Sequence, residues 1–201
     1  MARINGIKKL TDNRFLNLYQ LDARFRDGSR APYYLASRRK SVETIKASTH
    51  DNQPDGVILY GVHGQNKDKV VLIRQYRYPI DGYVYEFPAG LVEPGEDMLE
   101  AGIREMKEET GLSFTPIHAT NPYFMSVGMT DESCGYIFGY CSGAPTNANQ
   151  EGSEDIDVIL ADRAECRRIL KQEQVALPCA AMLMHFIATE EDPLKSLAQS
   201  K

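Results

Sequence analysis

The sequence lacks the features that mark membrane, secreted and zinc-binding proteins. It has no run of about eighteen apolar residues, which a membrane-spanning helix requires, and its first residues, MARINGIKKL, lack the apolar core of a signal peptide. Its four cysteines form no C-x-x-C pair and have no histidine at zinc spacing. We therefore expect a cytoplasmic protein with buried free thiols and no contact with a membrane.

Net positive charge and grouped histidines are also lacking. The formal net charge is −5, whereas nucleic-acid-binding surfaces are basic, so we expect no nucleic-acid partner. The four histidines are scattered along the chain, and no Ser-His-Asp or Cys-His arrangement is indicated. An acidic protein that handles phosphates would need cations or a local cluster of arginines.

The chain is large enough for a full hydrophobic core. It has 201 residues, of which 42% are hydrophobic and 25% charged, and these values are ordinary for a globular protein. Changes in pattern along the chain predict an N-terminal β subdomain at residues 1–50, a main domain at 51–190 and a polar tail at 191–201.

The N-terminal part reads as a β hairpin. Alternating apolar residues predict a strand over 15–25, and Asp27-Gly28-Ser29 predicts a turn into a second strand over 32–38. An isolated hairpin is marginally stable in water. It is therefore expected to pack on the main domain or on a second copy of the chain.

The main domain is predicted to be an α/β domain. Apolar runs predict strands over 56–63, 70–76, 83–87, 114–120, 133–140 and 156–160. Helical periodicity and capping signals predict helices over 97–110, 162–171 and 178–189. This order indicates a mixed sheet that is covered by helices on its faces.

The first of these helices carries the most informative segment, Gly90 to Leu112, with the sequence GLVEPGEDMLEAGIREMKEETGL. Asp97 suits the N-cap and Gly111 the C-terminal end. At 100° per residue, we expect the carboxylates to point outward together and an apolar stripe to dock on the core. The predicted carboxylates are Glu105, Glu108 and Glu109, and the predicted stripe is Leu99, Ile103 and Met106.

Carboxylates on adjacent turns repel each other unless a cation neutralises them. Oxygen ligands on a rigid frame suit Mg²⁺ or Mn²⁺. Arg104 lies one turn before Glu108 and can hold its carboxylate. A run such as Arg-Glu-Met-Lys-Glu-Glu by itself would suit a solvated helix face, but Gly90, Glu96 and Gly111 at their spacings favour a metal site.

The spacing G-x5-E-x7-R-E-(apolar)-x-E-E-x-G resembles the signature of the Nudix hydrolase family. The resemblance implies a Nudix α/β/α sandwich with a mixed sheet, preceded by the N-terminal antiparallel β hairpin or sheet. It also implies that Glu105 and Glu109 bind Mg²⁺ (or Mn²⁺) together with the carbonyl of Ala89. Glu108 and Glu96 would complete or orient the cluster. The catalytic set implied by the resemblance is Arg104, Glu105, Glu108 and, as a candidate base from a loop after the helix, Glu132.

Three further segments resemble the ADP-ribose and nucleoside-diphosphate-sugar pyrophosphatase branch: 74–79 (RQYRYP), 86–90 (EFPAG) and 128–132 (GMTDE). The branch hydrolyses a pyrophosphate and commonly dimerises through an N-terminal sheet, which implies a homodimer and a small nucleotide-sugar substrate. The candidate substrate-binding residues are Arg74, Gln75, Arg77 and Glu86. Arg74 and Arg77 are expected to share one face of a strand that grips phosphate.

The substrate stays open at this stage. Val127 stands where ADP-ribose enzymes of the branch commonly have proline, so UDP- and GDP-sugars remain alternatives to ADP-ribose. Dinucleoside polyphosphates and oxidised nucleoside triphosphates are further alternatives. A Nudix domain that binds a nucleotide sugar without hydrolysing it is the alternative from another functional class.

Overall fold

The computed structural model describes residues 1–150 and 155–195. The chain divides into two compact units: residues 1–55 join 122–134 in the first, and residues 56–121 join those from 135 onward in the second. We call these the N-terminal unit and the sheet-helix unit and describe each by itself.

The N-terminal unit contains a three-stranded antiparallel sheet in the order β1-β2-β3, made of β1 (Arg3–Lys9), β2 (Asn17–Arg24) and β3 (Arg30–Ser37). The predicted hairpin is confirmed: the Phe25 amide donates to the Ser29 carbonyl at 2.8 Å, and Gly28 has φ +93°. Only glycine adopts that φ readily. β1 was not predicted, since most of its side chains are exposed and its apolar residues do not alternate.

One face of this sheet packs a small core of Tyr19, Leu21, Leu35 and Ile45, next to the short helix α1 (Lys46–Thr49). Phe15 and Phe25, the two ends of the strand predicted over 15–25, lie outside β2 and are exposed.

Residues 122–134 belong to the N-terminal unit although they are distant from it in sequence. The strand β9 (Tyr123–Phe124) pairs with the first two residues of β10 (Ser133–Ser142). Ala36 of β3 donates its amide to the carbonyl of Met129 at 2.9 Å, so this segment adds backbone bonds to the β3 edge.

The sheet-helix unit is built on a mixed sheet with the central order β11-β5-β4-β10-β8, in which β6 pairs with β5 and β7 with β4. The strands are β4 (Gly56–His63), β5 (Lys69–Arg77), β6 (Gly82–Glu86), β7 (Ala89–Leu91), β8 (Ser113–Ala119), β10 and β11 (Ile156–Ala161), with a 3₁₀ turn at Tyr78–Ile80. The helices are α2 (Met98–Thr110), α3 (Arg163–Gln172) and α4 (Leu177–Ala188).

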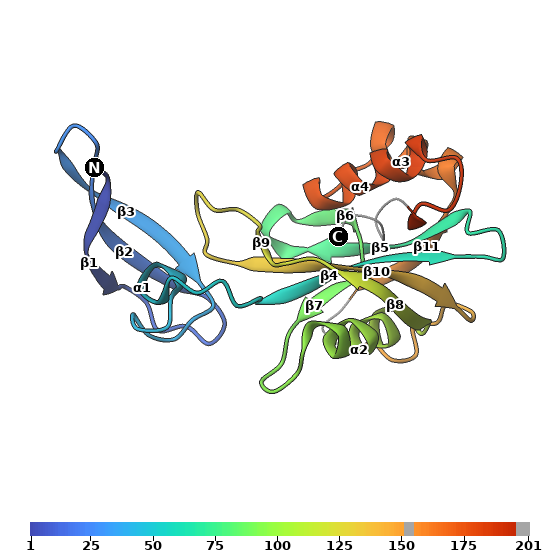
Figure 1. The fold of residues 1–201 in the computed structure, drawn as a ribbon, viewed down its shortest axis with the longest axis horizontal. Coiled ribbons are helices and arrows are strands. Elements are labelled where there is room, and N and C mark those ends of the chain that lie inside the picture. The colour runs from blue at the N-terminus through green and yellow to red at the C-terminus, as the bar shows by residue number, and fades with distance from the viewer. Residues whose placement is uncertain (151–154, 196–201) are drawn as a thin grey trace. The chain divides into compact units, whose positions relative to one another are not determined.

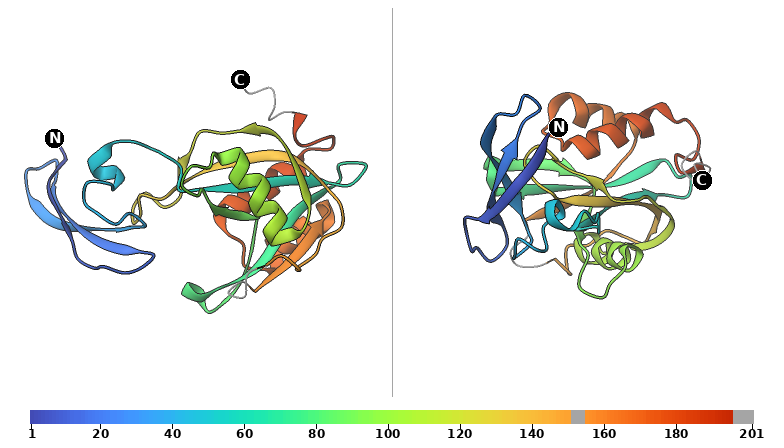
Figure 2. Two further views of the ribbon diagram at one scale, coloured as in Figure 1. Left: turned by 90° about the horizontal axis from the view of Figure 1, so that it is seen from below. Right: turned by 60° about the vertical axis from the view of Figure 1, so that its left-hand side comes forward.

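The helices cover both faces of this sheet. α2 lies on one face and α3 and α4 lie on the other (Figure 1), and the view from below shows α2 crossing the strands (Figure 2). The core under α2 gathers fully buried side chains from α2 and the strands, among them Leu59, Val71, Met106 and Ile137. The predicted α/β/α sandwich with a mixed sheet and an N-terminal antiparallel sheet is confirmed.

The end of the described chain is held by a buried carboxylate. Asp192 accepts hydrogen bonds from the Lys67 ammonium and the Tyr140 hydroxyl, both at 2.6 Å, and Leu194 is fully buried. Burial by itself raises the pKa of Asp192, but the hydrogen bonds lower the pKa by more than burial raises it. The pKa of Asp192 is therefore below its usual value. Residues 196–201 of the predicted polar tail lie outside the described residues.

In the described part of the chain, every helix is too short or too polar to cross a membrane.

Candidate active site

α2 begins and ends at the predicted residues. The Asp97 side chain accepts the amides of Leu99 (2.8 Å) and Glu100 (2.9 Å), and the Glu100 side chain accepts the Asp97 amide at 3.0 Å. This reciprocal capping satisfies amides that have no partner within the helix. Gly111 ends the helix at φ +73°, a conformation that favours glycine.

The buried face of α2 differs from the prediction. Met106 is fully buried, but Leu99 and Ile103 are 42% and 46% exposed, so the predicted apolar stripe was wrong for two of its three residues. The reason is the small Gly102: a Cβ there would lie 2.7 Å from the Ile137 side chain. Because Gly102 has no side chain, α2 packs closely on Ile137 at this position, and this packing turns Leu99 and Ile103 away from the core.

This rotation brings two of the predicted carboxylates inward. Glu109 is only 3% exposed, and its Oε2 accepts the Ala89 amide at 3.0 Å. The Glu105 side chain is also largely buried, while the Glu108 side chain is half exposed. The three glutamates therefore lie along the edge of the packed face instead of pointing outward together.

Arg104 joins most of the charged residues of the motif. Its Nε and Nη2 each donate to one oxygen of Glu96 at 2.9 Å, and its Nη1 donates to Glu105 (2.8 Å) and Glu108 (3.0 Å). Nη2 also donates to the Leu91 carbonyl at 3.0 Å. The predicted contact with Glu108 is confirmed, and the two-point contact with Glu96 uses the planar fork of the guanidinium.

This arrangement fixes the charge of both partners. Hydrogen bonding to Arg104 holds the pKa of Glu96 below its usual value of 4.5, and the Glu96 and Glu105 carboxylates raise the pKa of Arg104 although its burial acts in the opposite direction. The carboxylate of Glu96 is thereby kept ionised and oriented at neutral pH.

Arg104→Met is expected to lower the free energy of unfolding by about 2 kcal/mol at pH 7, since charged hydrogen bonds are lost from partly buried carboxylates. The lowered pKa of Glu96 means that its contribution is present above about pH 4.5 and is lost as the pH falls through the folded-state pKa. Urea unfolding at pH 7 and pH 3 checks this. A stability difference that stays constant between these pH values would contradict the assignment.

Gly90 makes room for Glu105. A Cβ at position 90 would lie 1.8 Å from the Glu105 carboxyl carbon, which is far inside contact distance. The carboxylate of Glu105 therefore rests directly on the backbone that follows Ala89, beside the Glu109 contact. The glycine of the motif is explained by this approach, since its backbone conformation is not left-handed.

A cavity of about 340 Å³ opens at this point, lined by Ala89, Gly90, Leu91, Glu93, Arg104, Glu105 and Glu108. Among residues 1–150 and 155–195, no three acidic, histidine or cysteine side chains already converge as ligands of one ion. Glu105 and Glu108 contact Arg104, and Glu109 contacts the Ala89 amide. The donor chemistry nevertheless fits a hard divalent cation, because all the side-chain donors are carboxylate oxygens beside an open cavity.

The predicted substrate-binding residues lie on β5 and β6. Arg77 donates to Glu86 at 2.7 Å, so two of them pair with each other. Arg74 lies over the Tyr83 ring at 3.9 Å and donates to Asp157 at 3.2 Å.

The expectation that Arg74 and Arg77 share a face was wrong. They are three residues apart on one strand, and side chains alternate with a period of two. The β5–β6 register places Glu86 opposite Ile73, on the face of Gln75 and Arg77.

Glu132 lies in the N-terminal unit, where its Oε1 accepts a hydrogen bond from Arg38 Nε at 2.8 Å. Sequence reasoning missed this contact, because Arg38 lies 94 residues before Glu132 and no local pattern links them. It also missed Glu93, which lines the cavity and whose amide donates to Glu96 at 3.1 Å. Glu93 stands at an unspecified position of the motif, so the pattern gave no signal for it.

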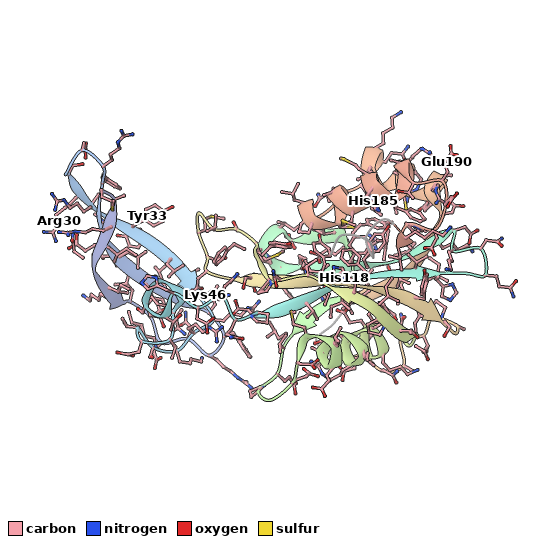
Figure 3. The ribbon with its side chains drawn as sticks, viewed as in Figure 1. Arg30, Tyr33, Lys46, His118, His185 and Glu190 are labelled. Atoms are coloured by element: carbon pink, nitrogen blue, oxygen red, sulfur yellow. The ribbon has the colours of Figure 1, made fainter. Side chains whose placement is uncertain are left out.

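The thiols and histidines have structural surroundings. Burial raises the pKa of Cys141 and of Cys166 to about 12, which makes poor nucleophiles of them. His118 on β8 stacks on Phe138, and His185 on α4 contacts the Pro193 carbonyl at 3.2 Å. Figure 3 labels both histidines.

An α/β/α sandwich with a carboxylate-bearing helix beside a cavity is the arrangement expected of a Nudix hydrolase domain. Residues 53–177, more than half of the chain, match the NUDIX domain family, and the chain belongs to the Nudix hydrolase family. Nudix hydrolases generally use divalent metal ions.

Known proteins support the assignment. A Caenorhabditis elegans protein that is named a nudix hydrolase is 38% identical over 135 residues, which cover 64% of this chain and 58% of that protein. The ADP-ribose pyrophosphatase of Saccharomyces cerevisiae is 42% identical over 64 residues, which cover 32% of this chain and 28% of that protein. The alignments thus span less than two thirds of either relative.

A solved structure of an ADP compounds hydrolase shares the fold. It has a TM-score of 0.64 and 19% identity, and the match covers 91% of this chain and 90% of that one.

Proposed function

We propose that the protein hydrolyses the pyrophosphate of a nucleoside-diphosphate sugar in a metal-dependent reaction, with ADP-ribose as the leading substrate. The products would be a nucleoside monophosphate and a sugar phosphate. The observation that carries this proposal is the placement of Glu105 against the Gly90 backbone, in the lining of a cavity, with Glu109 on the neighbouring Ala89 amide.

Glu105, Glu109 and the Ala89 carbonyl would hold Mg²⁺ or Mn²⁺, with Glu108 and Glu96 completing or orienting the set. The ions would supply neutralisation of phosphate charge and a lowered pKa for a bound water. Each carboxylate has two oxygens, so Glu105 can keep one bond to Arg104 while the other oxygen binds an ion. Arg104 would orient the carboxylates in this way.

The remaining roles fall to residues outside the helix. Glu132 would accept the proton of the attacking water as a general base. Arg77 would exchange its Glu86 partner for a phosphate oxygen of the substrate, since guanidinium pairs well with either anion. Gln75 lies on the same strand face as Arg77 and could add a polar contact. Arg74 is the weaker candidate for phosphate binding, because its guanidinium already contacts the Tyr83 ring and Asp157.

The names of the relatives favour ADP-linked substrates, since one relative is an ADP-ribose pyrophosphatase and the structural neighbour is an ADP compounds hydrolase. Val127 argues against an ADP-linked substrate, because it does not restrict the backbone as the proline of ADP-ribose enzymes would. The residue is 72% exposed. UDP- and GDP-sugars therefore belong in any test of the substrate.

We also propose that the protein is a homodimer that uses its N-terminal sheet. Large apolar side chains are exposed in this unit, among them Phe15, Leu16, Leu18, Tyr33 and Tyr34. Exposed apolar surface of this kind marks interaction sites. Light scattering of the purified protein would give the mass of the assembly directly.

The test is a panel of ADP-, UDP- and GDP-sugars incubated with the protein and Mg²⁺ or Mn²⁺, with the released monophosphate identified by chromatography. We expect AMP from ADP-ribose as the fastest product. EDTA is expected to stop turnover, and excess Mg²⁺ to restore it. Turnover that continues in EDTA would contradict the metal assignment, while saturable binding without product would favour a nucleotide-sugar-binding regulatory domain.

A further inference from the structure

The segment that carries Glu132 is held at several points by the N-terminal residues of its own unit. Near its middle, the Ala36 amide of β3 donates to the Met129 carbonyl at 2.9 Å. At its start, the Asn52 side chain donates to the Pro122 carbonyl at 2.9 Å. Hydrogen bonds from residues 1–55 therefore hold the backbone of this segment at Pro122 and at Met129, and both positions precede Glu132.

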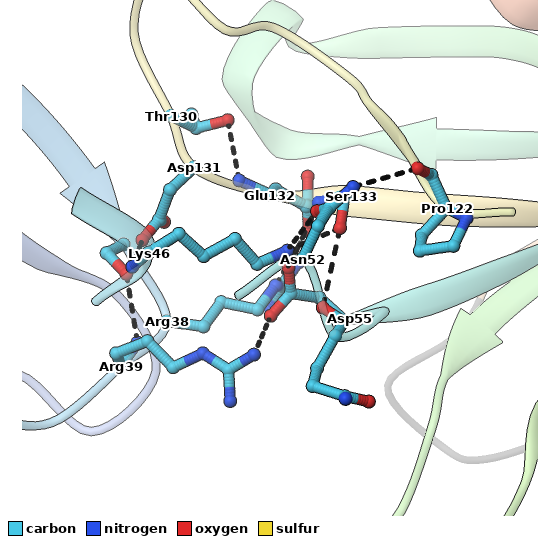
Figure 4. A network of polar contacts seen from close by, with 12 residues as sticks. Arg38, Arg39, Lys46, Asn52, Asp55, Pro122, Thr130, Asp131, Glu132 and Ser133 are labelled. Atoms are coloured by element: carbon cyan, nitrogen blue, oxygen red, sulfur yellow. Dashed lines mark hydrogen bonds and ion pairs between the residues drawn. The ribbon is translucent and has the colours of Figure 1, made fainter. Parts of the chain in front are cut away.

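The other end of the segment is held by a buried ion pair. Lys46 and Asp55 are joined at 2.7 Å, and their side chains are only 6% and 9% exposed. Asp55 also exchanges hydrogen bonds with the residue after Glu132: its Oδ2 accepts the Ser133 amide at 3.0 Å, and its amide donates to the Ser133 carbonyl at 2.8 Å. Figure 4 shows how Lys46 and Asp55 meet at Ser133. A buried pair with its hydrogen bonds satisfied specifies one local arrangement.

The side chain of Glu132 has its own contact, with Arg38 Nε at 2.8 Å. The side chains of Arg38 and Glu132 are partly exposed, at 45% and 30%, and pairs of this kind contribute little to stability. A glutamate has several rotatable bonds, so a charged partner at a fixed place restricts the directions in which its carboxylate points.

We propose that Arg38 is a positioning residue for Glu132, with the Lys46–Asp55 pair anchoring the backbone that carries it. The proposal rests on the proposed function in one respect, namely that Glu132 accepts the proton of the attacking water. Arg38 itself need not touch the substrate. Its contribution is to keep the base in one orientation between turnovers.

The experiment is a double-mutant cycle with Arg38→Gln, Glu132→Gln and the double variant, using the substrate that the wild-type protein hydrolyses fastest. We expect Glu132→Gln to lower kcat by a factor on the order of 10² and Arg38→Gln by about tenfold with little change in KM. The double variant should be no slower than Glu132→Gln alone, because Arg38 acts through Glu132. Losses that multiply in the double variant would overturn the proposal.

Arg30→Gln is the matched control, since Arg30 of β3 pairs with Asp22 on the same sheet (Figure 3). It should leave kcat unchanged, whereas Arg38→Lys should recover part of the activity lost in Arg38→Gln. Full activity of Arg38→Gln alongside an active wild-type protein would refute the positioning role.

A second readout does not depend on turnover. NMR relaxation of the Glu132 side-chain methylene groups reports how well that side chain is ordered, and the side chain should be more mobile in Arg38→Gln but not in Arg30→Gln. If the wild-type protein hydrolyses nothing in the panel, the proposed function fails, and this measurement still decides whether Arg38 orders Glu132. Equal side-chain mobility of Glu132 in the wild-type protein and in Arg38→Gln would refute that ordering.

Discussion

Glu109→Gln is expected to lower kcat by a factor on the order of 10³ or more and to leave the fold intact. Glutamine keeps the size of the side chain and an oxygen that can accept the Ala89 amide, which Glu109 Oε2 accepts at 3.0 Å. It lacks the negative charge with which a carboxylate binds and neutralises a divalent ion. Measuring turnover and thermal unfolding on the same preparation would separate a loss of catalysis from a loss of folding.

Glu100→Gln is the control for this experiment. Glu100 lies on the same helix and closes the capping box with its side chain, which glutamine can also do, and we place it outside the proposed metal set. The variant should keep normal turnover. If Glu109→Gln kept wild-type activity, the metal role of Glu109 would be wrong.

Gly90→Ala is expected to reduce kcat by a factor on the order of 10², because small displacements of groups at a reacting centre have effects of that size. The new methyl group would lie 1.8 Å from the Glu105 carboxyl carbon. The end of a glutamate side chain can swing away, so we expect little change in stability. Activity should fall because Glu105 would leave the place where it holds a metal ion.

Gly95→Ala is the matched substitution with the opposite balance. Gly95 has φ +89°, and no atom lies within 4 Å of the position that an alanine methyl group would take, so alanine there strains the backbone without meeting Glu105. It should lower stability by about 1 kcal/mol while turnover at saturating substrate stays near normal. A large stability loss in Gly90→Ala without a loss of kcat would contradict the role of Gly90 in making room for the Glu105 carboxylate.

Much of the fold could be predicted because its elements carry strong local signals. The continuous apolar run of β4 predicted its bounds of 56–63, and Asp97 and Gly111 marked the ends of α2. β7 and β9 were not predicted, because strands of three and two residues have too few side chains to show an alternation.

The candidate site could be predicted as a set of residues but not as an arrangement. Carboxylate spacing alone did not show that Glu109 is buried, because burial depends on how closely Gly102 lets α2 approach Ile137. The contacts of Arg74 with Tyr83 and Asp157 depend on pairing of β5 with β6 and β11. Tyr83 and Asp157 are not neighbours of Arg74 in the sequence, so a local sequence pattern does not reveal either contact.

Residues 122–134 have a consequence for how such chains can diverge. The family match covers 53–177 without a break, yet this stretch within it packs with residues 1–55. An exchange of the matched region between two relatives would separate Asp55 and Ser133 of the incoming sequence from the Lys46 that both contact. The contacts that hold residues 122–134 therefore extend beyond the matched domain, and we expect residues near Lys46 and Ser133 to change together among relatives.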